Sequence, residues 1–388
     1  MFNYGGHYID KKDISSLINV LKYDSLTQGK YVKKFETKLR DYFKCKHVLT
    51  VSSGTAGLHL ISKSLGWTKK DIILTSPITF AASVNSILYA NSTPEFVDID
   101  MDDYSISPKN IEKKIISLKK NKKKVKAIIV TDYGGQPAKW KEINRIKKKY
   151  KVQVVSDNCH SYGAKYFNKK SYATKYADIV SLSFHPVKHI TTGEGGAILT
   201  NKLKLFNTCK ILRSHGIIKK RRVNIGKKIN QMNFVGYNYR LTDIQCALGI
   251  SQLNKIDYFI KKRRKLAKLY DNIFKKKSCF IIPKQKKNSY HSYHLYPLLI
   301  DFEKLKISKE IFIKKLEEKK IFIQVHYVPV YKYNYYKKNF KINLNSLENS
   351  ENFYKKQISL PLYFSMKKKD IYSITKKIFE ILKIFFKV

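Results

Sequence analysis

The sequence predicts an α/β protein with a large domain, whose mostly parallel sheet is flanked by helices, and a smaller C-terminal α/β domain. Between roughly residues 45 and 205, short β-branched runs alternate with helical stretches, as in successive βαβ units. After about residue 260 the strands become fewer, and the helices become longer and richer in lysine. We therefore expect the large domain at residues 1–255 and the small domain at 256–388.

Periodicity and capping patterns predict the individual elements. Trp140, Ile143 and Ile146 recur at every third residue, which predicts an amphipathic helix over 139–150, and a further helix is expected over 57–64. Thr242 and Gln245 have the spacing of a capping box, which predicts the start of a long helix that runs through Ile256. Strands are expected at 71–74, 95–99, 126–131, 153–156, 179–184 and 196–200.

Three segments are less regular. Residues 219–228 are basic and lack periodicity, which predicts a mobile surface loop. Residues 321–330 have an extended pattern and are expected to pair in a smaller sheet. The tyrosine- and lysine-rich tract 330–350 is low in complexity and predicts a solvated loop; the alternative is a surface that stacks on single-stranded bases.

The net charge of +49, from 78 Lys and Arg against 29 Asp and Glu, raises the question of a polyanionic partner. The basic residues are spread over nearly every expected helix and loop and do not gather in one tail or stripe. We therefore interpret the charge as compositional drift and expect no specific nucleic-acid partner, with polyanion binding as the alternative. The charge should still attract phosphate-bearing substrates.

Cysteine usage and hydropathy indicate a cytoplasmic protein without a membrane segment. The five cysteines are scattered and contain no C-x-x-C pair, as expected in a reducing compartment. The first residues lack a signal pattern, and each apolar run ends well short of the roughly 20 residues that a membrane span needs.

Lys188 is the first candidate catalytic residue. It follows an expected buried strand, precedes a glycine-rich strand start and has few charged neighbours in sequence. Desolvation at such a position lowers the pKa of a lysine and leaves a neutral amine that can attack an aldehyde. A structural lysine is the alternative for this residue taken alone.

Asp157 and His160 follow another expected strand, at the carboxyl edge of the sheet where ligands of open α/β sheets bind. A carboxylate there can pair with a protonated pyridine nitrogen, and His160 can donate a hydrogen bond to a phenolic oxygen of the same ring. A helix N-cap and a helix-surface histidine are the respective alternatives.

A phosphate site is expected where residues 52–55 precede a helix, because free backbone N–H groups and the helix dipole suit an anion there. Ser53, Gly54 and Thr55 are the candidates, and Ser183 can add a hydroxyl. Phe80 can stack on an aromatic cofactor ring. An ordinary helix cap is the alternative for the first three.

These segments together resemble the DegT/StrS family of sugar-nucleotide aminotransferases, which have the fold type I of pyridoxal-phosphate enzymes. The similarity extends from Leu26 to Tyr363 and is most specific in HPVKHITTGEGGA and NYRLTDIQCALGISQL; further matching segments are LTQGK, SSGTAGLHL, SPITFAAS, DYGGQPA, SDNCHSYGA, LRSHGI and QVHYVPVY. Cys159 and Ser161 depart from the small alanines that are usual beside the aspartate, and His189 is uncommon after the lysine.

The resemblance implies pyridoxal 5′-phosphate as the cofactor, pyridoxamine 5′-phosphate as an intermediate, and a homodimer with active sites at the interface. By motif, Lys188 forms the Schiff base, Asp157 holds the pyridine nitrogen and His160 lies near the phenolic oxygen. The resemblance assigns phosphate binding to Ser53, Gly54, Thr55 and Ser183, and to Asn238 of the partner subunit. The substrate is assigned to Tyr4, Leu26, Thr27, Ser53, Asn238, Arg240, Gln324, His326 and Tyr327.

Within the family, LTQG, SPITF, GGQP and LRSHGI are most similar to members of the pseudaminic acid pathway. This implies amino transfer from glutamate to C4 of a UDP-linked 4-keto-6-deoxy-N-acetyl hexose. A GDP- or dTDP-linked 3-keto or 4-keto sugar is the alternative substrate, and a regulatory or nucleic-acid-binding protein on the same fold is the alternative function. No metal site is expected, since the pairs His185/His189 and His291/His294 lack further ligands.

Overall fold

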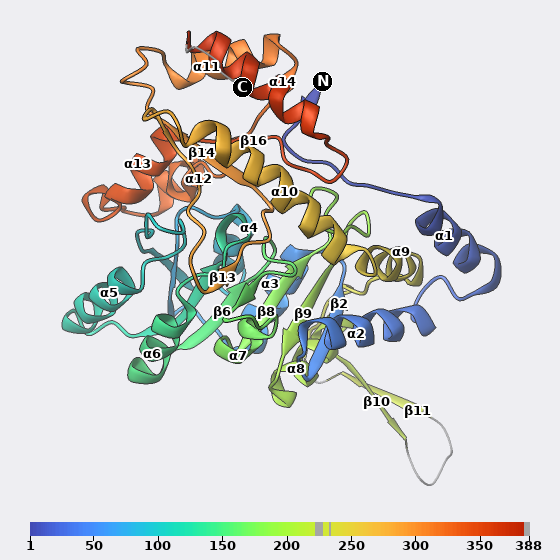
Figure 1. Ribbon diagram of the computed structural model, residues 1–388. Helices are drawn as coiled ribbons and strands as arrows, with labels where there is room; N and C mark the ends of the chain where they lie inside the picture. The colour runs from blue at the N-terminus through green and yellow to red at the C-terminus, as the bar shows by residue number, and fades with distance from the viewer. Residues whose placement is uncertain (222–227, 233, 384–388) are drawn as a thin grey trace.

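The computed structural model describes residues 1–221, 228–232 and 234–383 and confirms the predicted α/β class. Its centre is a seven-stranded sheet of order β2-β9-β8-β6-β5-β3-β4 (Figure 1). Every pairing in this sheet is parallel except those of β9, which runs antiparallel to β2 and β8. The strands are β2 (His47–Val51), β3 (Ile72–Thr75), β4 (Thr93–Phe96), β5 (Val125–Thr131), β6 (Gln153–Asp157), β8 (Ile179–Ser183) and β9 (Gly196–Thr200).

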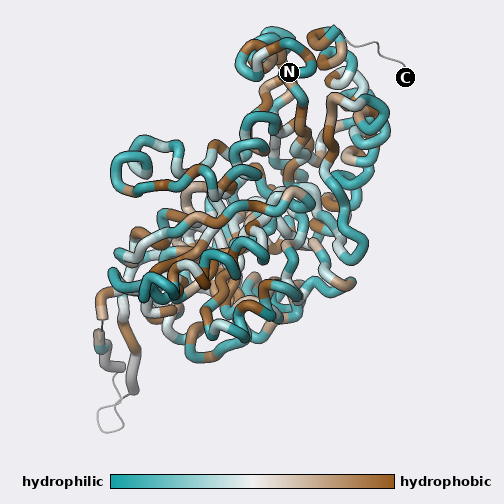
Figure 2. The backbone as a smooth tube through the Cα atoms, turned by 90° about the vertical axis from the view of Figure 1, so that its left-hand side faces the viewer, coloured by the Kyte–Doolittle hydropathy of each residue, from teal (hydrophilic) through white to brown (hydrophobic). Residues whose placement is uncertain are grey.

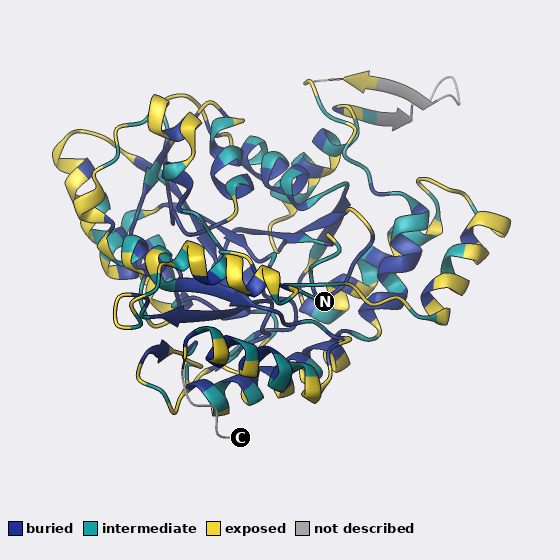
Figure 3. Cartoon of the chain, turned by 90° about the horizontal axis from the view of Figure 1, so that it is seen from above, coloured by how far each residue is buried: buried dark blue, intermediate teal, exposed yellow. Residues whose placement is uncertain are grey.

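Helices cover both faces of this sheet, so its strands are buried on both sides. Alternate residues of β5 show this directly, because Ile128 and Val130 lie in one hydrophobic core and Ala127 and Ile129 in the other. Figure 3 shows buried strands inside and exposed outer faces on the surrounding helices. The helices are α2 (Lys30–Phe43), α3 (Gly54–Ser64), α4 (Ala81–Leu88), α5 (Pro108–Lys120), α6 (Trp140–Tyr150), α7 (Tyr172–Tyr176) and α8 (Leu203–Arg213).

The long helix predicted from Thr242 is two helices. The capping box of Thr242 and Gln245 is confirmed, but α9 (Asp243–Leu253) ends before α10 (Ile256–Phe274) begins. At the break, the Lys255 ammonium lies 2.9 Å from Asp10 and 2.6 Å from the fully buried Asp13, next to α1 (Lys11–Tyr23). Ion pairs with residues far away in the sequence therefore lie at the turn between the two helices, and helical periodicity cannot predict them.

Two segments expected as loops contain regular structure. Residues 217–232 include a hairpin of β10 (Ile217–Arg221) and β11 (Lys228–Met232), so the loop predicted at 219–228 is wrong at both ends, and its residues 222–227 lie outside the described part. The tract 330–350 is not a solvated loop. It forms η2 (Val330–Lys332), α12 (Asn334–Asn339), η3 (Leu344–Ser346) and the start of α13 (Glu348–Lys356), and Tyr331 and Tyr336 pack on Phe96 in a buried cluster.

A second core lies in the C-terminal part of the chain. Its three-stranded sheet has the order β12 (Phe280–Ile281), β14 (Tyr296–Ile300), β16 (Gln357–Leu360), and it packs with α10, α11 (Lys309–Glu318) and α14 (Lys368–Ile381). The helix α10 joins both cores, because Ile256 and Phe259 belong to the first and Leu266 to the second. The predicted boundary at residue 256 stays a prediction.

The N-terminus is part of this C-terminal region. The strand β1 (Phe2–Asn3) pairs with β15 (Ile321–Phe322), the two-residue strand within the extended segment expected at 321–330. The N-terminus and α14, the last described helix, lie on the same side of the molecule (Figure 1; the N-terminus is also marked in Figure 2). The short strands β7 (Lys165–Tyr166) and β13 (Ser289–Tyr290) make another pairing between the two regions. Within the described residues, every helix is too short or too polar to cross a lipid bilayer.

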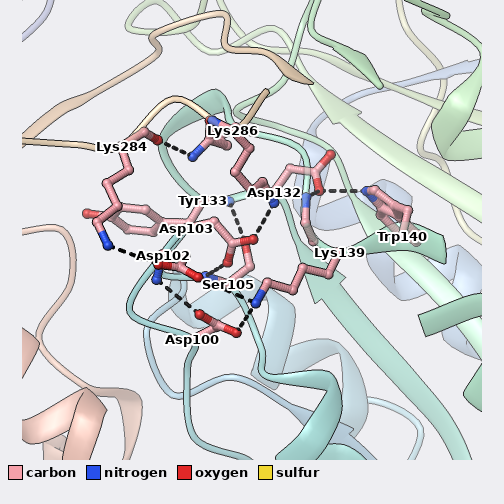
Figure 4. A network of polar contacts seen from close by, with 12 residues as sticks. Asp100, Asp102, Asp103, Ser105, Asp132, Tyr133, Lys139, Trp140, Lys284 and Lys286 are labelled. Carbon is pink, nitrogen blue, oxygen red and sulfur yellow. Dashed lines mark hydrogen bonds and ion pairs between the residues drawn. The ribbon is translucent and has the colours of Figure 1, made fainter. Parts of the chain in front are cut away.

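Ion pairs also connect the two regions (Figure 4). Lys286 pairs with the buried Asp103, and Lys284 lies 3.1 Å from Asp102. Both lysines follow β12, whereas the aspartates belong to the loop after β4, so the network spans residues about 180 positions apart. Lys139 completes it, at 2.5 Å from Asp100.

Beside this network, Asp132 is fully buried at the end of β5. One carboxylate oxygen accepts from the Ala138 N–H at 2.8 Å and from Trp140 Nε1 at 2.9 Å; the other accepts from Asn158 at 2.8 Å and from the Tyr172 hydroxyl. Burial raises the pKa of Asp132 to about 6, against these hydrogen bonds, which lower it. The carboxylate thereby holds the loop after β5 against the start of α6.

Replacing Asp132 with Asn should lower the free energy of unfolding at pH 7.5 by about 1–3 kcal/mol. The amide NH2 group would face two donors and could accept from neither of them. Chemical denaturation measures the change, with the exposed Asp41→Asn as the control. A loss equal to that of the control would contradict a net stabilising role of the Asp132 carboxylate at this pH.

Candidate active site

A cleft of about 600 Å³ lies at the carboxyl ends of β2, β5, β6 and β8, where residues 324–327 of the C-terminal region face the sheet. This is the edge at which open α/β sheets bind ligands. Twelve of the residues predicted from the sequence line the cleft: Tyr4, Ser53, Gly54, Thr55, Phe80, Asp157, His160, Ser183, Lys188, Gln324, His326 and Tyr327.

Lys188 enters the cleft from the loop between β8 and β9. The loop is held closed at its base, since the Phe184 N–H donates to the Gly195 carbonyl at 2.8 Å and the Thr192 N–H to the Phe184 carbonyl at 3.0 Å. Burial lowers the pKa of Lys188 below its usual value, and the negative charge of Asp157 opposes this effect. The geometry therefore favours a fraction of neutral, nucleophilic amine larger than an exposed lysine has.

Asp157 is the last residue of β6 and is 5% exposed. Its Oδ2 accepts a short hydrogen bond from the Ser83 hydroxyl, and its Oδ1 accepts from the Cys159 N–H at 3.2 Å. An ionised carboxylate has about four acceptor positions, so these two donors leave capacity for a cationic N–H group of a ligand. Ser83, which the sequence analysis missed, orients this carboxylate from α4.

The first turn of α3 lines the cleft at the position where the sequence predicts a phosphate site. The Ser53 hydroxyl caps the helix by accepting from the Ala56 N–H at 3.0 Å, and the earlier N–H groups of Gly54 and Thr55 have no intrahelical acceptor. A Cβ on Gly54 would lie 2.9 Å from Cβ of Ser183. Only glycine permits this approach, which brings the Ser183 hydroxyl beside the helix start.

His160 and Phe80 lie on other sides of the cleft. The His160 ring is 2% exposed, its Nε2 lies 2.9 Å from the Tyr327 hydroxyl, and its buried Nδ1 has no partner among the described residues. Phe80, the residue before α4, is 57% exposed, with its ring centroid 6.1 Å from that of Tyr327. Its exposed ring is available for stacking.

The C-terminal side of the cleft carries the residues assigned to a substrate. His326 Nδ1 lies 2.9 Å from the Ser359 hydroxyl, and the Tyr4 ring lies 5.0 Å from the His326 ring. The backbone of Gln324 forms an isolated antiparallel β-bridge with Ser359 of β16. These contacts bring the N-terminal residues and the segment before η2 to the same wall.

Four predicted residues do not line this cleft. Leu26 and Thr27 lie in an exposed segment that Asp243 holds against α9, by accepting from the N–H groups of Gly29 at 2.7 Å and Tyr31 at 2.8 Å. Asn238 and Arg240 follow the hairpin β10–β11, where Asn238 is exposed and Arg240 half-buried.

Sequence reasoning missed further residues of the cleft. His294 lies beside His160, with ring centroids 4.4 Å apart, and Glu194 and Tyr333 also line the cleft. In the sequence, His294 stands out only as part of the His291/His294 pair, for which no metal site is expected. Its position beside His160 results from folding that brings distant parts of the chain together. Among the residues that the structure describes, no group of three or more His, Cys, Asp or Glu side chains is placed to hold a metal ion.

Comparisons with known proteins agree with this geometry. A model of the DegT/DnrJ/EryC1/StrS aminotransferase family matches residues 7–379. The UDP-4-amino-4,6-dideoxy-N-acetyl-beta-L-altrosamine transaminase of Campylobacter jejuni strain 81-176 is 40% identical over 382 residues, 98% of each chain. The enzyme of the same name from Helicobacter pylori is 35% identical over 377 residues, 96% of each chain. Helicobacter pylori PseC, an aminotransferase involved in the biosynthesis of pseudoaminic acid, has a solved structure with TM-score 0.90 and 33% identity, covering 99% of this chain and 100% of that one.

Replacing Gly54 with Ala should weaken the binding of pyridoxal 5′-phosphate about tenfold or more. The added methyl group would clash with Ser183 and displace its hydroxyl from the start of α3. Equilibrium titration followed by absorbance measures the affinity. The control is Gly6→Ala, whose added Cβ would meet its nearest neighbour at 3.6 Å. Equal affinities for the two variants would contradict a phosphate position at the start of α3.

Proposed function

Because the chain belongs to the DegT/DnrJ/EryC1/StrS aminotransferase family, we propose that it transfers an amino group from glutamate to C4 of a UDP-linked 4-keto-6-deoxy-N-acetyl hexose. The route would be the biosynthesis of pseudaminic acid, a nonulosonate, or of a related surface-glycan sugar. The names of relatives that match nearly the whole chain support this substrate class. The observation that carries the chemistry is the single cleft that contains the Lys188 amine, the Asp157 carboxylate and the first turn of α3.

The residues of the cleft fit pyridoxal 5′-phosphate, the cofactor of this family. Gly54 lets the start of α3 approach Ser183 so closely that a Cβ would clash with it, Asp157 keeps free acceptor positions, and among the described residues the buried Nδ1 of His160 has no partner. When bound, the cofactor supplies an aldehyde that condenses with amines and a ring that accepts electrons released at carbon. Ser53, Gly54, Thr55 and Ser183 would hold its phosphate.

In this proposal the side chains of the chain position charges and move protons. Lys188 Nζ removes the proton from Cα of glutamate in the first half-reaction and delivers a proton to C4 of the sugar in the second. Its lowered pKa suits both directions, because the neutral amine is accessible near neutral pH. Asp157, held by Ser83, would balance the positive charge of the protonated pyridine nitrogen of the cofactor.

The proposed active unit is a homodimer. Asn238 and Arg240, which do not line the cleft of their own chain, would complete the partner's site. Apolar exposure next to these residues supports this arrangement, since Phe234 is 41% exposed and Val235 77% exposed. Exposed apolar side chains that lie together are typical of a covered interface.

The proposed location is the cytoplasm, and the proposed partners are the nucleotide sugar and glutamate. All five cysteines are free thiols and at most half-exposed, which suits a reducing compartment. The positive charge of the chain should raise the encounter rate with a diphosphate-bearing sugar at low salt.

Replacing Lys188 with Ala should abolish amino transfer while the fold remains. The purified protein would be incubated with pyridoxal 5′-phosphate, glutamate and a panel of UDP-, GDP- and dTDP-linked 3-keto and 4-keto sugars, with products read by mass spectrometry. We expect amination of the UDP-linked 4-keto-6-deoxy-N-acetyl hexose by the wild type and by Lys175→Ala, a variant of a lysine outside the cleft. Turnover by Lys188→Ala would refute the role of Lys188, and a product only from another sugar would refute the substrate.

A further inference from the structure

We infer that Tyr327 is a positioning residue that selects one tautomer of His160: the tyrosine hydroxyl donates to Nε2, so that the remaining proton lies on Nδ1 as a donor to the phenolic oxygen of the bound cofactor. The inference rests on the proposed function. It also changes the expected role of Tyr327, which the sequence analysis assigned to the substrate alone.

The first step is the direction of the hydrogen bond between Tyr327 and His160. Their polar atoms are 2.9 Å apart, and the two rings are nearly parallel, at an interplanar angle of 19°. Within the described residues, the Tyr327 hydroxyl has His160 as its hydrogen-bond partner. A phenolic hydroxyl carries one proton, and Nε2 offers a lone pair in one of the two neutral tautomers. Donation from the hydroxyl satisfies both groups, whereas the reverse direction leaves the tyrosine proton without a protein acceptor.

The second step concerns the opposite nitrogen. His160 Nδ1 is buried and has no hydrogen-bond partner among the described residues. A buried polar atom without a partner costs about 1–3 kcal/mol, so such atoms in native proteins commonly mark a ligand or water position. With Nε2 engaged by Tyr327, Nδ1–H is the donor that His160 can offer to an anionic oxygen.

The third step is that His160 stays neutral, which makes the choice of tautomer decisive. Burial lowers the pKa of His160 well below its usual value, and a positive charge on Lys188 lowers it further. The His294 ring lies beside the His160 ring at an interplanar angle of 39°, and its own pKa is lowered by burial as well.

Within the described residues, the influences on the pKa of His160 all lower it, burial first and then positive charge. A neutral imidazole carries one N–H, and Tyr327 determines which nitrogen has it.

Tyr327 is itself held in place from both regions of the chain. The neighbouring His326 carbonyl accepts a short hydrogen bond from the Tyr133 hydroxyl, and the His326 N–H donates to the Gln357 side chain at 3.0 Å. The ring of Phe80 lies beside Tyr327 on the cleft side. The hydroxyl is therefore attached to a fixed backbone, as a positioning residue requires.

The test is the pH titration of the absorbance of the bound cofactor, without substrate. A donor at the phenolic oxygen competes for the proton that this oxygen shares with the Lys188 nitrogen, so loss of the donor should make that proton bind more tightly. Tyr327→Phe frees His160 to adopt either tautomer and should raise the pKa of the titration by about one unit, a tenfold change in the equilibrium constant. Tyr331→Phe is the matched control, because its hydroxyl bonds to Glu351 outside the cleft.

Repeating the Tyr327→Phe substitution in a His160→Phe variant tests whether Tyr327 acts through His160. His160→Phe removes both ring nitrogens and should raise the pKa at least as much as Tyr327→Phe does. Adding Tyr327→Phe to His160→Phe should then cause no further shift. An additional shift in the double variant would overturn the inference, because Tyr327 would act on the cofactor by another route.

The outcomes separate this inference from the proposed function. A Tyr327→Phe variant with an unchanged titration, and only a higher KM for the nucleotide sugar, would assign Tyr327 to the substrate and overturn the inference, while the proposed function stands. A wild-type protein whose absorbance shows no titratable bound cofactor would instead contradict the proposed function.

Discussion

The account depends on one constraint: a lysine amine is buried in the same cleft as an aspartate. Burial of Lys188 disfavours its charged form, and Asp157 is the nearby carboxylate that limits this effect. An exposed lysine, of which this chain has many, keeps its proton at neutral pH and is a poor nucleophile. The difference between Lys188 and the other lysines is therefore one of environment, which the loop between β8 and β9 provides.

The sheet explains why these groups meet. Parallel strands end at one edge, so Thr131 of β5, Asp157 of β6 and Ser183 of β8 reach the cleft from adjacent or nearby strands, and α3 starts at the same edge. The antiparallel strand β9 returns the chain directly after Lys188 and pairs with both β8 and β2. The rigid part of the site consequently comes from the sheet, and the C-terminal region adds Gln324, His326 and Tyr327 as a wall.

The residues that sequence reasoning placed correctly are those whose signal is local. The helix at Trp140–Tyr150, the capping box at Thr242 and the edge position of Asp157 follow from spacing and strand ends. At the break, Lys255 forms an ion pair with Asp13, and in tract 330–350 Tyr331 and Tyr336 pack against Phe96. Periodicity does not carry such contacts. Likewise, the approach of His294 to His160 joins residues far apart in the chain.

Chemical trapping of the cofactor on the protein identifies directly which lysine is reactive. The cofactor-loaded protein would be reduced with borohydride, digested and mapped by mass spectrometry across all of its lysines. The account predicts one modified peptide, with the added mass on Lys188. Modification of a different lysine, or of many lysines to similar extents, would contradict the claim that burial beside Asp157 makes this amine the reactive one.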